Sequence, residues 1–106
     1  MTDLPAPPAA FVSFTQSHPE LAAAWEAAGI AGREGPLDSD TVRLIKLAVA
    51  IGAMREGAVH ASVRKALAQG IPAEALDQIV AIAAGTIGFP ATVAAHTWVH
   101  DILEVD

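Results

Sequence analysis

Two ionisable side chains that could exchange a proton stand four residues apart near the start of residues 54–70, "MREGAVHASVRKALAQG". Glu56 and His60 have the spacing at which side chains meet on one side of a helix. On a helical wheel Glu56 falls between apolar positions, and His60 lies at the rim of that face. We therefore expect the carboxylate to point inward or into a cleft and to hydrogen-bond the imidazole, as a general acid and base near neutral pH.

Basic side chains near this pair could hold an anionic substrate. Arg64 flanks His60 on the wheel, and Lys46 interrupts an apolar segment that precedes it. Trp98 could line a pocket beside this helix or anchor a core or interface. The alternative for Glu56 and His60 is a structural polar link between helices or subunits. The hypothesis names catalytic residues Glu56 and His60, and substrate-binding residues Lys46, Arg64 and Trp98.

A second set of residues has the helical spacing of metal ligands. His96 and His100 are one turn apart, and Glu104 follows one turn later. Catalytic zinc takes three protein ligands with supporting contacts, whereas Glu104 stands near the chain end, where a helix frays. We expect a solvated face and predict no metal and no cofactor, while metal binding by the two histidines stays an open alternative.

Six helices are expected to position these groups, because alanine is abundant and no segment alternates apolar and polar residues. Gly29 is the expected end of the second helix, and Ser39 or Asp40 the expected cap of the third. The third and fifth helices are apolar nearly all round and are expected to be buried. The predicted helices cover 7–17, 19–29, 39–53 and 54–70 and begin at 72 and 90, with a loop at 30–37.

The composition restricts the partners. The chain has 106 residues, of which 53% are hydrophobic and 17% charged, more apolar surface than a small domain easily hides. We therefore expect self-association as a homo-oligomer. The net charge of −6, without a basic run, argues against nucleic acid. The sequence lacks an uninterrupted apolar helix that would predict a membrane span. It also lacks a basic, apolar leader that would predict secretion, so we expect a cytoplasmic location.

Most of the chain, about residues 37–99, resembles the carboxymuconolactone decarboxylase / AhpD-like alkylhydroperoxidase family. The resemblance lies in "LIKLAVAIG", "EGAVHASVRKALAQG", "PAEALDQIV" and "GFPATVAA". It implies an all-α helical bundle that assembles as a trimer or hexamer. We divide the chain into an N-terminal arm and first helix, 1–18, and a helical domain, 19–106, within a single domain overall.

The peroxidase branch of the family uses a Cys-x-x-Cys pair and a histidine four residues later. The resemblance places Arg55 and Ala58 at the cysteine positions, Ser62 at the histidine and Arg43 at an upstream glutamate. The chain has no cysteine, so dithiol reduction of peroxides is not available to it.

The decarboxylase branch lacks those cysteines, and its stretch "REAELKLHVR" resembles "REGAVHASVR" here. The match supports Glu56 and Arg64, whereas the family histidine again falls on Ser62, so His60 depends on the wheel argument. The resemblance implies a cofactor-free acid/base enzyme, of lyase or isomerase type, acting on a small organic acid or lactone. The alternative is a non-catalytic oligomeric module that binds a small molecule or has a structural role.

Overall fold

The computed structural model of the protein describes residues 6–104, and this part of the chain is entirely helices and their connections. The all-α prediction is confirmed. The six helices are α1 (Ala9–Ser17), α2 (Pro19–Arg33), α3 (Ser39–Gly52), α4 (Glu56–Ala68), α5 (Ala73–Ile87) and α6 (Phe89–Leu103).

Two predicted helix boundaries are wrong. Gly29 does not end α2, which continues to Arg33, because one glycine in a helix costs only about 1 kcal/mol and neighbouring alanines outweigh it. The cap of α3 is Asp38 rather than Ser39 or Asp40. Its carboxylate accepts a hydrogen bond from the backbone N–H of Thr41 at 2.8 Å.

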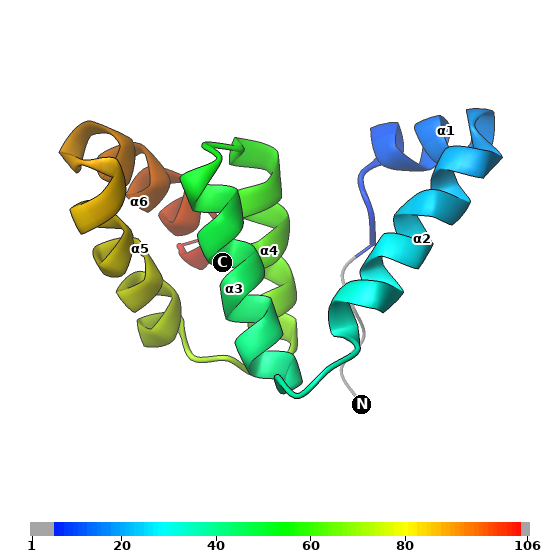
Figure 1. The fold of residues 1–106 in the computed structure, drawn as a ribbon. Coiled ribbons are helices and arrows are strands. Elements are labelled where there is room, and N and C mark those ends of the chain that lie inside the picture. The colour runs from blue at the N-terminus through cyan, green and yellow to red at the C-terminus, as the bar shows by residue number, and fades with distance from the viewer. Residues whose placement is uncertain (1–5, 105–106) are drawn as a thin grey trace.

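Helices α3 to α6 pack into a four-helix bundle, seen at the left and centre of Figure 1. Helix α3 packs against α4 and α5, and α6 packs against α4 and α5. The apolar stripes of the four helices meet in one core, as helical periodicity requires. The largest fully buried side chains are Leu47, Ile51, Val59, Val63, Leu76 and Val99.

Helices α1 and α2 form a hairpin that stands apart from the bundle (Figure 1). Neither helix contains a buried residue. Phe11 and Trp25 join the two helices through an edge-to-face ring contact, with centroids 6.3 Å apart. The hairpin therefore presents its apolar side chains to solvent or to another chain.

The expectation that α3 and α5 are buried nearly all round is wrong for the single chain. Val49 on α3 and Ile82 on α5 are each 64% exposed. A four-helix bundle covers one stripe of each helix, so apolar residues on a second side have no cover.

Helices α3 and α4 end in the same backbone arrangement, a Schellman motif. After α4, Gly70 has φ 91°, and the N–H of Ile71 donates to the carbonyl of Ala66. After α3, Met54 fills the equivalent position with φ 55°. These turns set the angle at which α4 begins and ends, and thus place its side chains.

No helix in the described part of the chain has both the length and the apolar character needed to cross a membrane.

Candidate functional site

Glu56 is exposed, so the prediction that its carboxylate points inward is wrong. Glu56 is also not among the residues that line the cavity described below, although the sequence allowed it to point into a cleft. Its direction on the wheel was correct, because it shares a stripe with the buried residues Val59 and Val63. However, Glu56 is the first residue of α4, where that stripe passes beyond the end of the core. A helical wheel gives a direction around the axis and contains no information about depth along it.

His60 is half-buried and contacts an acid that the sequence did not suggest. Its Nε2 atom lies 3.0 Å from Oδ2 of Asp101 on α6. The carboxylate of Glu56 is also near, since one ligand atom from each of Glu56, His60 and Asp101 lies within 4.8 Å of the others. The imidazole is therefore flanked by two carboxylates, one from its own helix and one from α6.

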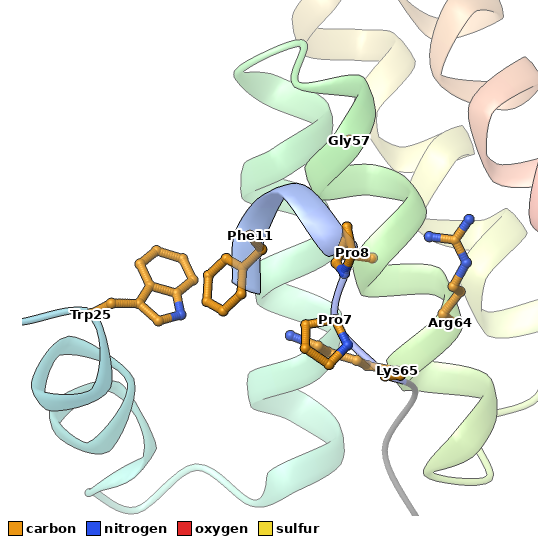
Figure 2. Close-up of a pocket in the computed structure, with 9 residues that line it drawn as sticks. Pro7, Pro8, Phe11, Trp25, Gly57, Arg64 and Lys65 are labelled. Carbon is orange, nitrogen blue, oxygen red and sulfur yellow. The ribbon is translucent and has the colours of Figure 1, made fainter. Parts of the chain in front are cut away.

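A partly open cavity of about 690 Å³ lies between the N-terminal segment, the α1–α2 hairpin and α4. Its apolar wall includes Pro7, Pro8, Phe11 and Trp25 (Figure 2). Helix α4 supplies the opposite wall. The lining residues are Ala6, Pro7, Pro8, Phe11, Trp25, Gly57, Ala61, Arg64 and Lys65.

Two cations of α4 line this cavity. Arg64, one of the predicted substrate-binding residues, is among the residues that line it. Lys65 also lines it, although it is not among the predicted site residues. The residue was missed because the cavity wall opposite α4 comes from residues 6–8, Phe11 and Trp25, whose placement is not encoded in the periodicity of α4.

Further cations lie behind this wall. Partial burial lowers the pKa of Lys65, and the charges of Arg43 and Lys46 lower it further. Partial burial lowers the pKa of Lys46 too, followed by the charges of Arg43 and Arg33. For Arg43, burial is again the main cause of a lowered pKa, with Arg33 second. The four side chains therefore form a cationic cluster, defined here as Arg33, Arg43, Lys46 and Lys65.

Within residues 6–104, no carboxylate lies within 4.0 Å of a lysine or arginine nitrogen, since the ion pairs found there all use histidine. The Nε atom of Arg43 is buried without a hydrogen-bond partner among the described residues. The chain has twelve acidic and six basic residues, so carboxylates are plentiful. The cationic cluster nevertheless has no direct ion pair with a carboxylate among the described residues.

The remaining predicted residues lie elsewhere. Lys46 is exposed and belongs to the cationic cluster, but it does not line the cavity. Trp98 is half-buried and packs against the hydrophobic core, away from the cavity lining.

His100 of α6 has a carboxylate on either side of its ring. Nδ1 of His100 lies 2.7 Å from Oε2 of Glu104, and its Nε2 lies 2.9 Å from Oδ1 of Asp77 on α5. The hydrogen bond to Asp77 is the main cause of a raised pKa of His100. Desolvation opposes it, and the hydrogen bond to Glu104 adds to the rise. The ring of His96 lies against that of His100, with centroids 4.2 Å apart. Spacing predicted the approach of Glu104, but not that of Asp77.

The model of the Carboxymuconolactone decarboxylase family matches residues 19–101. Searches of curated proteins and of solved structures gave no match.

Proposed function

We propose, for a chain that belongs to the carboxymuconolactone decarboxylase family, a role in binding a small anionic organic molecule in the cavity between the α1–α2 hairpin and α4. The chain is a cysteine-less member, and thiol chemistry takes no part in this role. The cavity volume of about 690 Å³ lies within the range of about 300–1,000 Å³ found for small-molecule sites.

The observation that carries the proposal is the gathering of cations at one wall. Arg64 and Lys65 face the cavity, and the charges of Arg43 and Lys46 act on Lys65 from behind. A bound carboxylate would neutralise part of this repulsion. Arginine is suited to the task, because its guanidinium can donate two parallel hydrogen bonds to one carboxylate.

The opposite wall fits the apolar part of such a molecule. Phe11 and Trp25 present aromatic surface, and Trp25 is 66% exposed in the single chain. The two rings already contact each other, and rings held in place before binding lose little entropy when a ligand covers them. The proposed ligand is therefore an organic acid with an apolar body.

We also propose that the chain acts as a homo-oligomer. The α1–α2 hairpin buries none of its residues, and large apolar side chains remain exposed on both the hairpin and the bundle. Exposed apolar surface of this extent is typical of subunit interfaces. A second copy would cover the hairpin, and a trimer or hexamer is the assembly that the family resemblance implies.

A second candidate function is a cofactor-free acid/base enzyme, of lyase or isomerase type, acting on a small organic acid or lactone. The contact between His60 and Asp101 favours it, because a carboxylate that holds an imidazole prepares it for proton transfer. His60 lies one turn before Arg64, so a substrate bound by Arg64 would come near this imidazole. In this candidate Glu56 and His60 would be catalytic, and a panel of lactones assayed with His60→Gln and Glu56→Gln tests it. Equal turnover by parent and both variants would remove it.

Calorimetric titration with octanoate and with 1-octanol tests the binding proposal. Octanoate and 1-octanol share a chain and differ in charge, so the proposal expects octanoate to bind with a Kd below about 1 mM and the alcohol to bind less tightly. Arg64→Gln and Lys65→Gln should each weaken octanoate binding by about ten-fold, which is the effect of losing a hydrogen bond to a charged group. Arg55→Gln is the matched control, since Arg55 is an exposed cation that does not line the cavity. Equal binding of acid and alcohol, or an equal loss in Arg55→Gln, would contradict the proposal.

A further inference from the structure

The strongest unassigned cluster outside the cavity joins α5 to α6. Asp77 comes from α5, and His96 and His100 come from successive turns of α6. One ligand atom from each of the three side chains lies within 4.8 Å of the others. Asp77 and His96 are exposed and His100 is half-buried, so an ion in solution can reach all three.

We propose that Asp77, His96 and His100 form a binding site for a divalent cation of the Zn²⁺ type. Two imidazoles and one carboxylate are a donor set that Zn²⁺ and its neighbours among the transition metals accept. Zn–N and Zn–O distances of about 2.0–2.2 Å put ligand atoms about 3.3 Å apart in a tetrahedral site. Nε2 of His100 lies 2.9 Å from Oδ1 of Asp77, near that spacing, and a ring nitrogen of His96 lies within 4.8 Å of both ligand atoms.

Glu104 supplies an independent argument for the site. A histidine that binds a metal through one ring nitrogen usually donates its other N–H to a carboxylate, which fixes the ring. His100 has this arrangement, with Nε2 facing Asp77 and Nδ1 lying 2.7 Å from Glu104. The ring is therefore already oriented with Nε2 toward the three-residue cluster.

The second cluster of similar composition, Glu56, His60 and Asp101, is a weaker candidate. It offers one imidazole and two carboxylates, and within residues 6–104 no hydrogen bond holds the second ring nitrogen of His60. Because the α5–α6 cluster has two imidazoles and an oriented ring, we assign the cation to it. The cluster of Glu56, His60 and Asp101 then serves as a comparison site in the same chain. The inference does not depend on the proposed binding of an organic acid, because none of its residues lines the cavity.

Calorimetric titration of the full chain, free of any histidine tag, with ZnCl₂ at about pH 7.5 tests the site. We expect one ion per chain at micromolar Kd, and a higher melting temperature with Zn²⁺ present, because an ion that binds the folded state stabilises it. His96→Gln, His100→Gln and Asp77→Asn should each weaken binding by at least about ten-fold. Glu104→Gln should weaken it less, through the orientation of His100.

Two variants serve as controls for the same titration. His18→Gln removes a histidine outside both clusters, and His60→Gln removes the imidazole of the second cluster. Both should bind Zn²⁺ as the parent does, and circular dichroism establishes that each variant is folded. Absence of binding below about 0.1 mM, equal binding by the His96 and His100 variants, or loss in His60→Gln would overturn the assignment.

Discussion

Nε2 of His60 lies 3.0 Å from Oδ2 of Asp101, a contact that joins α4 to α6 across forty-one positions of the chain. The contact replaces the bond within α4 that the four-residue spacing of Glu56 and His60 predicted. Helix α6 also packs against α4 in the core, and the His60–Asp101 pair lies on the solvent-exposed side of that interface. The imidazole of His60 therefore links two helices. In any proton transfer by His60, Asp101 would be the carboxylate that holds the ring.

A double-mutant cycle on His60→Ala and Asp101→Ala should give a coupling free energy of about 0.5–1 kcal/mol, the range for partly exposed ion pairs. Urea unfolding of the parent, the single variants and the double variant measures it. The matched cycle on His60→Ala and Glu56→Ala should give less, because Glu56 is exposed at the helix start. A larger coupling of His60 with Glu56 than with Asp101 would mean that His60 pairs with Glu56, as the sequence suggested.

The two Schellman motifs predict opposite changes in stability when a glycine is removed from one and introduced into the other. Gly70→Ala places a side chain at φ 91° and should destabilise the fold by about 1 kcal/mol. Met54→Gly removes a side chain from φ 55° and should stabilise it by about 0.5–1 kcal/mol, because the backbone strain exceeds the entropy that glycine adds to the unfolded chain. Urea midpoints give both values. A loss of stability in Met54→Gly would mean that packing of the methionine outweighs its backbone strain.

Much of the fold follows from the sequence, because helix formation depends on neighbours along the chain. Alanine content and apolar periodicity gave all six helices. The end of α2 was missed since Gly29 is a weak breaker among strong helix formers. The degree of burial of α3 was missed for another reason: periodicity shows which residues are apolar, whereas the number of helices that cover them is a property of the packing.

Less of the candidate site could be predicted. Arg64 lines the cavity, but the positions of Lys65, Asp77 and Asp101 beside their partners depend on how different segments pack together. Such contacts depend on helix angles and register, which a single sequence does not state. The burial of Glu56 was predicted wrongly for a related reason, because the neighbouring helices set the distance from a helix end to the edge of the core.

The cap of α3 predicts a pH dependence of stability. The backbone hydrogen bond from Thr41 lowers the pKa of Asp38 below its ordinary value of 3.8, aided by a side-chain hydrogen bond of Thr41. Because the pKa is lower in the folded state, the stabilisation is present above the ordinary pKa and is lost as pH falls through the lowered one. Asp38→Asn keeps a capping oxygen and does not titrate, so the advantage of the parent over this variant should shrink at acid pH. Paired urea midpoints at about pH 7 and about pH 3 measure it, and an unchanged difference would exclude the carboxylate as the cause.

The uncovered apolar side chains predict how self-association responds to substitution. Leu21 on α2 and Ile82 on α5 are 53% and 64% exposed in the single chain. At a subunit interface, Leu21→Ser or Ile82→Ser would each cost about 1.5–3 kcal/mol of association free energy, whereas on a free surface either change is nearly neutral. We expect the parent to show a multiple of the chain mass by light scattering and a melting temperature that rises with protein concentration. The serine variants should dissociate at concentrations where the control Gln78→Ser, an exposed polar position on α5, stays assembled. A parent that remains a single chain at high concentration would leave the hairpin without its proposed cover and would contradict the homo-oligomer.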